Sequence, residues 1–420
     1  MCNALTVPRL RPLFSPEIVH YICTYLSRAE LFALTLVSRF FRDVAHWHLM
    51  DSLTVEPRTN EVSQRYVTSL IEGSSKPVVR HVMLDIAIAM YQILYAVSKA
   101  CSPESTRSLA VASSIRYADW NYLSTIFTKH LAFHLPRVDT LLLKPLDSRF
   151  QFALMSAFSS TLVKLTIYSA ICATRDGWSQ ITLPCLEDIA LVQDAPVPAS
   201  EDSIILLVVK FIEIPKLKHA SLIAVTDGRV FSVYEFLLAF ASTLESVKIL
   251  GLFHYESHSQ RLLPKLQRVT SFNIEADLAH GMFLLTDDGP DFLPGLKRFT
   301  IEGDWKSLDD GSYNLQWKSM KRTFTHIAGI SPKPVVVCGY RGATVRNRGI
   351  FSRNMVGQLR DASGWDIRDT FMVEERRCED MPSRRSGFID TTPRLRHVLP
   401  VKPQNLLSDD GDSDGSDSVI

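Results

Sequence analysis

Residues 183–191 read LPCLEDIAL, and this short pattern decides the fold that we predict for most of the chain. An apolar anchor, Leu186, is followed by Ile189 three residues later and by Leu191 two residues after that. Because side chains alternate between the two faces of a strand, Ile189 and Leu191 would point the same way. The anchor would turn inward just before the strand begins. The pattern therefore predicts a short buried strand with a buried turn ahead of it.

The same spacing of apolar residues recurs at irregular intervals through the middle of the chain. Copies begin at Leu135, Ser160, Leu183, Ile214, Ser242, Leu263 and Leu293. In the copy that begins at Leu263, Ser271 takes the place of the last apolar residue, and we expect Phe272 or Ile274 to fill in through a bulge. Residues 79–84 form a plausible earlier copy. A repeat of this kind indicates stacked units that share one core.

Segments with helical periodicity separate several copies, and we predict helices at residues 86–100, 119–135, 149–158, 202–212 and 233–241. One strand and one helix per repeat would stack into a curved solenoid with a parallel sheet on its concave side. The repeat length of roughly 22 to 31 residues resembles irregular leucine-rich repeats. The asparagine or cysteine that follows the strand in regular repeats of that family is absent. The alternative is a compact α/β domain with a parallel sheet.

Residues 14–49 read FSPEIVHYICTYLSRAELFALTLVSRFFRDVAHWHL and carry start signals for three short helices. Ser15 and Pro16 form an N-cap followed by proline at the first helical position. Ser27 and Glu30 have the spacing of a capping box, and Ser38 can cap a third helix. Domains this small bury little surface. Apolar side chains should therefore remain available to a partner.

This stretch resembles the F-box family. The family pattern opens with Leu-Pro-x-Glu and closes with Val-Ser/Cys-Arg/Lys-x-Phe/Trp, and here residues 14–17 and 37–41 take those places. Phe14 and Ser15 depart from the opening leucine and proline, which weakens the first contact point. The resemblance implies docking on a Skp-type adaptor that links to a cullin. The residues that match the motif, and would dock or shape the dock, are Pro16, Glu17, Ile18, Ile22, Leu26, Leu31, Leu34, Val37 and Phe41. The alternative is a generic helical hairpin.

The outward positions of the predicted strands would line the concave face, where repeat proteins usually bind their partners. This face becomes basic toward its C-terminal strands. The residues that we expect to bind a protein substrate are Lys164, His219, Lys248, Arg268 and Arg298. Arginine forks match carboxylate and phosphate groups, so this end would prefer an acidic or phosphorylated segment. A merely solvated sheet face is the alternative.

The composition changes along the chain and suggests four parts. These are an F-box at residues 1–56, a leucine-rich-repeat-like solenoid at 57–304 with clear repeats from about 135, a C-terminal cap at 305–372, and a disordered charged and acidic tail at 373–420. Pro334 to Val337 would form one more strand inside the cap. The tail ends in SDDGDSDGSDS, which lacks the apolar residues that a core needs.

Several classes of protein do not fit the sequence. The formal net charge is +1, and acids interleave Arg376-Arg377 and Arg384-Arg385, so we expect no nucleic-acid partner. The longest wholly apolar run, residues 204–209, is too short to span a bilayer, so we expect no membrane partner. Seven cysteines, none at CxxC spacing, indicate a reducing compartment, the cytoplasm or the nucleus.

We find no phosphate-binding glycine loop, nucleophile elbow or HExxH zinc motif, so we expect no enzyme, cofactor or metal. His254 and His258 have helical spacing, but no carboxylate or cysteine arrangement supports a metal there. The sequence favours a substrate-recognition subunit of an SCF-type (Skp–cullin–F-box) ubiquitin ligase. The alternatives are an F-box scaffold that does not direct ubiquitination and, disfavoured, an enzyme of unknown class.

Overall fold

The structure of the 420-residue chain is a computed structural model. It describes residues 16–23, 25–26, 28–50, 52–55, 79–85, 94–95, 97–98, 101–112, 120–144, 146–168, 178–193, 203–254, 265–275, 292–303 and 334–340. Contacts divide the chain into two units, Met1–Cys378 and Glu379–Ile420, and all the described residues lie in the first. The predicted tail and most of the predicted cap therefore lie outside the described residues.

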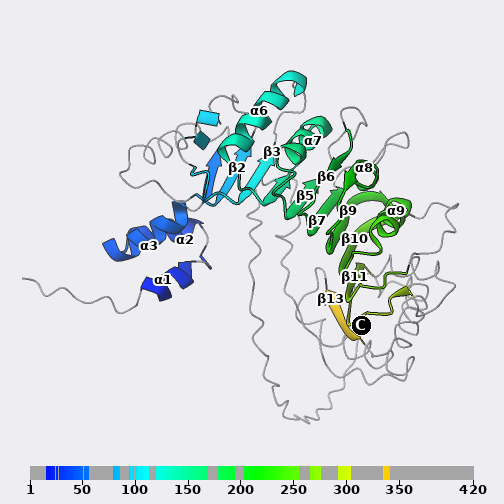
Figure 1. Cartoon of the computed structure of the whole chain (residues 1–420). Coiled ribbons are helices and arrows are strands. Elements are labelled where there is room, and N and C mark those ends of the chain that lie inside the picture. The colour runs from blue at the N-terminus through cyan, green and yellow to red at the C-terminus, as the bar shows by residue number, and fades with distance from the viewer. Residues whose placement is uncertain are drawn as a thin grey trace, which may run out of the picture. The chain divides into compact units, whose positions relative to one another are not determined.

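Three helices open the described part of the chain: α1 (Pro16–Cys23), α2 (Arg28–Thr35) and α3 (Arg39–Met50) (Figure 1). Ser38 caps α3 as predicted, because its Oγ accepts a hydrogen bond from the Phe41 N–H at 3.3 Å. The helices share a small core of their own. Its buried members are Val19, Cys23, Leu31, Val44 and Ala45, with Leu26, Leu34, Phe40 and Phe41 packed against them.

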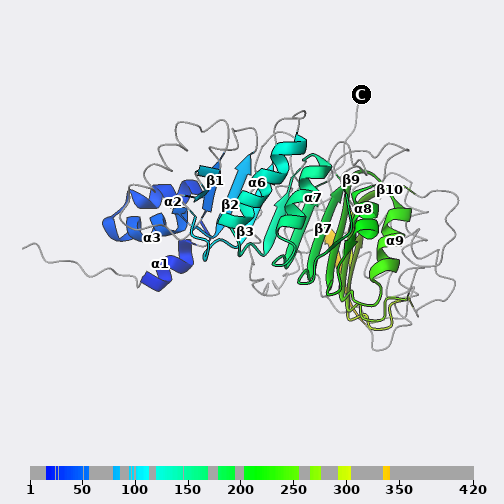
Figure 2. The same ribbon diagram turned by 45° about the horizontal axis from the view of Figure 1, so that its top comes forward.

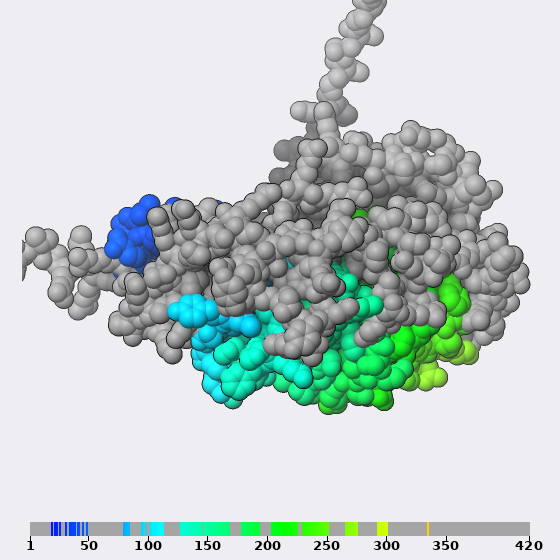
Figure 3. All heavy atoms as spheres, turned by 90° about the horizontal axis from the view of Figure 1, so that it is seen from above, coloured from blue at the N-terminus to red at the C-terminus, as the bar shows by residue number. Residues whose placement is uncertain are grey.

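The rest of the described chain is mixed α/β with a large parallel sheet. The strands are β1 (Ser52–Val55), β2 (His81–Asp85), β3 (Ser108–Ala112), β4 (Thr140–Leu143), β5 (Lys164–Tyr168), β7 (Asp188–Gln193), β9 (His219–Arg229), β10 (Ser246–His254), β11 (Ser271–Glu275), β12 (Arg298–Gly303) and β13 (Val335–Tyr340). They pair in this order, each parallel to the next. In the space-filling view the residues coloured cyan to green follow one another in a continuous band (Figure 3).

The helices between the strands are α6 (Trp120–His134), α7 (Ser148–Ala157), α8 (Ile204–Phe211) and α9 (Val230–Phe240). The strand order never reverses, and crossovers between parallel strands are right-handed, so all four must lie on one face of the sheet. Figures 1 and 2 show this arrangement. Each helix was predicted to within three residues at either end. Of the helix predicted at 86–100, residues 94–95 and 97–98 are described, and they are helical.

One continuous core runs between the sheet and these helices. Side chains alternate along β3, β4 and β11, where every second residue is buried. Phe272 and Phe299, neighbours in the register, stack with ring centroids 6.3 Å apart. Phe150 of α7 and Phe236 of α9 are almost fully buried in the same core. We call the other side of the sheet, away from α6 to α9, the helix-distal face.

The turns that lead into the strands are joined by a repeated pair of hydrogen bonds. The Arg107 carbonyl accepts from the N–H groups of Asp139 (2.9 Å) and Thr140 (3.1 Å). The Asp139 carbonyl then accepts from Val163 (2.7 Å) and Lys164 (2.9 Å), and the pattern continues to β12. At β13 the Val335 N–H alone donates to the Lys297 carbonyl (2.8 Å), because Pro334 has no N–H. Buried backbone groups need partners, and here each repeat supplies them to the next. A unit removed from its neighbours would lose these bonds.

Two polar side chains form hydrogen bonds with backbone groups of other segments. The buried Gln151 amide of α7 donates to the Tyr168 carbonyl at 2.8 Å and to the Lys144 carbonyl at 3.4 Å. The Glu275 carboxylate accepts a hydrogen bond from the Gly251 N–H. Gly251 has φ 105°, and a Cβ there would lie 1.7 Å from the Ala224 carbonyl oxygen. Glycine is therefore required at this position.

The structure corrects the frame of the sixth repeat. Strand β11 begins at Ser271, and Phe272 and Ile274 are buried in regular register, without the bulge that we predicted. Val269 is the anchor of this copy, three residues later than predicted. Arg268 therefore lies in the turn ahead of the strand and not on the sheet face. The prediction was wrong because Leu266 lies three residues before the true anchor and was taken for it. Leu293 lies three residues before the anchor Leu296 in the following copy.

The structure also adds strands that the sequence analysis missed. Strand β3 has a polar residue, Thr106, at its anchor position, so its copy broke the apolar pattern. Thr106 is fully buried, and its hydroxyl donates to the Val79 carbonyl at 2.9 Å. Strand β1 lies within the segment assigned to the predicted F-box. The predicted strand at Pro334 to Val337 is present as β13, which extends the sheet past residue 304.

Candidate interaction surfaces

Helix α1 buries one face and presents the other. Val19 and Cys23, four residues apart, are buried in the small core, and burial raises the pKa of the Cys23 thiol. Ile18 and Ile22, also four residues apart, are 50% and 44% exposed. A stripe at helical spacing usually marks the buried face. Here it marks a face of α1 that its neighbours in the described chain leave accessible.

Two tyrosines extend this accessible face. Tyr21 and Tyr25 are one helical turn apart, and their rings meet edge to face with centroids 5.1 Å apart. The Tyr25 hydroxyl donates to the Tyr21 hydroxyl at 2.7 Å, and this bond raises the pKa of Tyr25. Both rings are exposed, 59% for Tyr21 and 43% for Tyr25. The contact holds the rings against each other and gives the surface a fixed aromatic part.

The turn between α2 and α3 adds two more exposed aliphatic side chains. Leu36 is 72% and Val37 is 65% exposed. We call six residues of α1, of the turn that follows it and of the α2–α3 turn the N-terminal apolar set: Ile18, Tyr21, Ile22, Tyr25, Leu36 and Val37. Scattered exposed apolar residues are normal, but six within twenty residues of chain are typical of a binding surface.

The structure divides the predicted adaptor-binding residues into two groups. Ile18, Ile22 and Val37 are exposed and available to a partner. Leu31 is buried, and Leu26, Leu34 and Phe41 pack on the small core, so these four shape the surface from beneath. Pro16 and Glu17 begin α1, and their side chains lie outside the described set. The sequence analysis missed Tyr21 and Leu36, although helical spacing places Tyr21 beside Ile18 and Tyr25.

Three of the predicted substrate-binding residues lie in one row of the helix-distal face. The row follows the register across six strands and consists of Lys164, Asp188, His219, Ser246, Ser271 and Arg298. Lys164, His219 and Arg298 are exposed. Lys248 lies two residues further along β10 on the same face. Five spacings of about 4.8 Å separate Lys164 from Arg298, roughly 24 Å in all, so these residues do not form one compact site.

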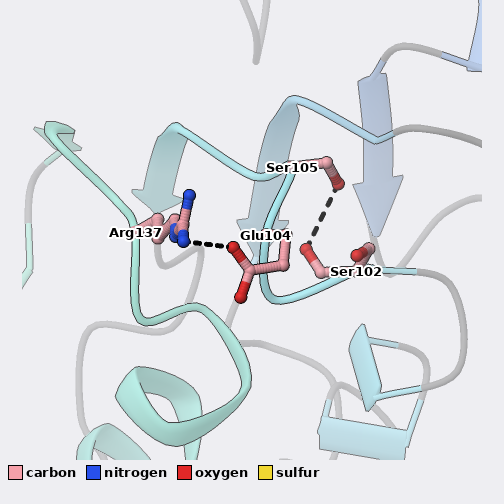
Figure 4. Close-up of polar contacts among 4 residues, drawn as sticks. All are labelled: Ser102, Glu104, Ser105 and Arg137. Atoms are coloured by element: carbon pink, nitrogen blue, oxygen red, sulfur yellow. Dashed lines mark hydrogen bonds and ion pairs between the residues drawn. The ribbon is translucent and has the colours of Figure 1, made fainter.

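The turns ahead of the first strands balance acids and bases. Arg137, ahead of β4, forms an ion pair with Glu104, ahead of β3 (Figure 4). In the same view the Ser105 hydroxyl donates to the Ser102 carbonyl at 3.2 Å. Asp139 accepts a hydrogen bond from the Thr140 hydroxyl at 2.9 Å. The Glu104–Arg137 pair thus brings opposite charges together on this part of the edge.

The described residues contain few groups that are arranged for metal binding or for reaction as a nucleophile. They hold no group of three or more histidines, cysteines and carboxylates arranged for a metal ion. No helix in this part of the chain is long and apolar enough to cross a membrane. Cys23, Cys101 and Cys185 are free thiols. Burial raises the pKa of Cys101 to about 12, so this thiol is protonated and unreactive near neutral pH.

Comparisons with protein-family models and with curated proteins found no match to this chain. The interpretation of these surfaces therefore rests on their own geometry and chemistry.

Proposed function

We propose that this protein is the substrate-recognition subunit of an SCF-type ubiquitin ligase. In this proposal α1 to α3 act as an F-box that docks on a Skp-type adaptor, and the adaptor links the chain to a cullin. The parallel sheet and its helices act as a curved leucine-rich-repeat-like solenoid that holds a protein substrate. The observation that carries the proposal is the N-terminal apolar set on a three-helix segment with the F-box spacing.

The energetics of the helical segment support a docking role. Full burial of a valine, leucine or isoleucine side chain stabilises by about 1.5 to 3 kcal/mol. Ile22, Leu36 and Val37 keep from 44% to 72% of their surface accessible, so a partner would gain a large part of that energy. A partner that covers them stabilises the segment and the complex together.

The sheet supports the second half of the proposal. Strands that pair in chain order, with helices on one face, are the arrangement expected of stacked repeats. The helix-distal face then offers a surface many strands wide. Its first row combines two cations, an acid, a histidine and two hydroxyl groups, which suits a polar protein segment better than a small apolar ligand. The protein would raise the effective concentration of substrate lysines near the ubiquitin-loaded enzyme and perform no bond chemistry itself.

Affinity capture in cells tests the proposal. The tagged full chain is compared with an Ile22→Asp/Val37→Asp variant while the proteasome is blocked. We expect a Skp-type adaptor and a cullin to accompany the full chain, together with ubiquitinated proteins, and all three to be lost with the variant. If neither adaptor nor cullin is captured, the proposal fails. If both are captured but no ubiquitinated protein accumulates, the chain is an adaptor-binding scaffold.

A further inference from the structure

The turns ahead of β9, β11 and β12 carry a cluster of cations. Its members, which we call the basic edge, are Lys216, Lys218, Arg268 and Lys297 in these turns and Arg298, the first residue of β12. Four of them, all except Lys218, are exposed and form no ion pair or side-chain hydrogen bond within the described chain. Lys218 is half-buried, and its Nζ lies 3.1 Å from Glu187 Oε1. The described turn ahead of β10, the strand between β9 and β11, carries the acid Glu245.

The sheet brings these residues together although more than eighty positions separate them in sequence. Strands β9, β10, β11 and β12 are consecutive neighbours in the sheet. Their turns are tied at equivalent positions: Glu245 N–H donates to the Lys218 carbonyl, Thr270 N–H to Glu245, and Lys297 N–H to Thr270, each at 2.8 Å. Three spacings of about 4.8 Å therefore span the basic edge, roughly 14 Å.

The other half of the same edge has a different charge. The turns ahead of β3, β4, β5 and β7, together with the first residues of these strands, carry the acids Glu104, Asp139, Glu187 and Asp188 among the bases Arg107, Arg137 and Lys164. The fold is the same in the two halves, so stacking does not require a cationic edge. Like charges this close repel one another, which makes the basic edge a cost to folding unless a partner neutralises it.

The geometry points to an acidic protein segment as the occupant of the basic edge. We infer that an extended segment with clustered carboxylates lies across the turns ahead of β9 to β12; about four to five residues at 3.3 Å each would span the edge. The inference rests on the proposed function for the statement that the sheet holds a protein. Arginine forks and lysine ammonium groups are suited to carboxylate and phosphate oxygens alike.

Other anionic partners fit these turns less well. Single-stranded nucleic acid is bound through aromatic platforms on which bases stack, and no exposed aromatic side chain lies in the described turns ahead of β9 to β12. Peripheral membrane binding needs apolar side chains that enter the lipid interface. The large apolar residues of these turns, such as Leu217, Leu266 and Leu296, are buried in the core.

Fluorescence anisotropy with the full chain tests the inference. The probes are a labelled peptide of twelve residues with a central cluster of four glutamates and the same peptide with glutamines. The test variant is Arg268→Glu/Lys297→Glu. The control variant, Arg107→Glu/Lys129→Glu, makes the same change in formal charge at exposed positions away from the basic edge. We expect the full chain to prefer the acidic peptide at least tenfold, the test variant to lose at least tenfold, and the control less than twofold.

Equal losses in the two variants would reduce the effect to global charge and overturn the inference. So would equal binding of the two peptides, or tighter binding of a single-stranded oligonucleotide or of vesicles rich in phosphatidylserine. A doubly phosphorylated serine peptide that competes for the same edge would support the shared anion chemistry. Adaptor binding by the full chain and by both variants is measured in parallel. If the test variant still binds the adaptor but has lost the acidic peptide, the inference about the basic edge is confirmed on its own. If neither the full chain nor either variant binds the adaptor, the proposed function is rejected separately.

Discussion

The three N-terminal helices leave many large apolar side chains exposed, whereas the parallel sheet and its helices bury most of theirs. The helices enclose five buried residues and leave six large apolar side chains exposed. The sheet and its helices enclose one continuous core from Val79 to Phe299, in which each repeat covers the next. The difference follows from size, because a small segment cannot cover its own apolar surface and a stacked array can. We therefore propose that the helices bind a partner through exposed apolar residues and that the sheet binds one through its charges.

If the sheet encloses a continuous core, its interior should tolerate few substitutions. Replacing Gly251 by alanine would place Cβ 1.7 Å from the Ala224 carbonyl oxygen at φ 105°. The substitution should destabilise the sheet by about 5 kcal/mol, the range reached by severe backbone clashes. Urea unfolding of the purified chain measures the change. A loss below about 1 kcal/mol would show that β9 and β10 can separate without cost.

Replacing a core phenylalanine should lower the stability of the chain far more than replacing a surface phenylalanine. Phe272→Ala removes a fully buried ring that stacks on Phe299 and should cost about 3 to 5 kcal/mol. Phe133→Ala removes a ring that is 76% exposed on α6 and should change stability by less than about 0.5 kcal/mol. The two unfolding midpoints, measured side by side, would coincide if the sheet core were loosely packed.

The helical segment allows the same test on a single helix. Val19→Ala opens the small core and should cost about 2 kcal/mol locally, because Val19 is 1% exposed. Ile22→Ala should leave local stability within about 0.5 kcal/mol. Hydrogen exchange of the α2 and α3 amides should accelerate about thirtyfold with the first change and stay nearly constant with the second. Faster exchange in β9 and β10 as well would show that the two cores are one.

A smaller effect should appear at alkaline pH. The pKa of the Cys101 thiol is raised from 9.0 to about 12 by burial, so the unfolded chain loses this proton first. The stability from the neutral thiol is present below pH 9 and declines as the pH rises from 9 toward 12. At pH 10 the loss is about 1.4 kcal/mol relative to pH 8. Subtracting the free energy of unfolding of a Cys101→Ala variant from that of the full chain, at each pH, isolates the contribution of this thiol from other titrating groups. A difference that does not change with pH would contradict the prediction.

The smallest effect is expected at the surface of the sheet. Glu104→Gln removes the ion pair with Arg137, whose two side chains are 69% and 51% exposed. Solvent screens such pairs, so stability should fall by less than about 1 kcal/mol and less still at high salt. A loss comparable to that of Phe272→Ala would show that edge charges, and not the core, hold the repeats together.

How much the sequence could predict depends on which side chains a contact involves. Strands such as β4 and β7 were predictable because Leu141 and Leu143, or Ile189 and Leu191, follow an apolar anchor at the spacing of the repeat. Strand β3 was not, because the hydroxyl of Thr106 finds its acceptor on Val79, twenty-seven residues away. The N-terminal residues that we propose for docking were named as a set from the F-box resemblance. Their division into Ile22 outside and Leu31 inside depends on how three helices pack, which helical spacing alone does not determine.

The basic edge illustrates the same limit. Lys248 and Arg298 were found by considering strand positions. Lys216 and Lys218 were passed over because turn residues were not compared between repeats. The hydrogen bonds that align the turns bring these positions together with Lys297. A sequence aligned by its anchors, Leu217, Leu244, Val269 and Leu296, would have shown the charge pattern.

The central claim is that the N-terminal apolar set docks a Skp-type adaptor. The most direct measurement is the Kd of the purified full chain for a purified Skp-type adaptor, compared with Ile22→Asp/Val37→Asp and with Phe133→Asp as the control for an added acid on an exposed apolar site. We predict binding by the full chain and by the control, and at least a hundredfold weaker binding by the double variant, with unchanged unfolding midpoints. Absence of binding by the full chain, or equal Kd values for all three proteins, would contradict the account.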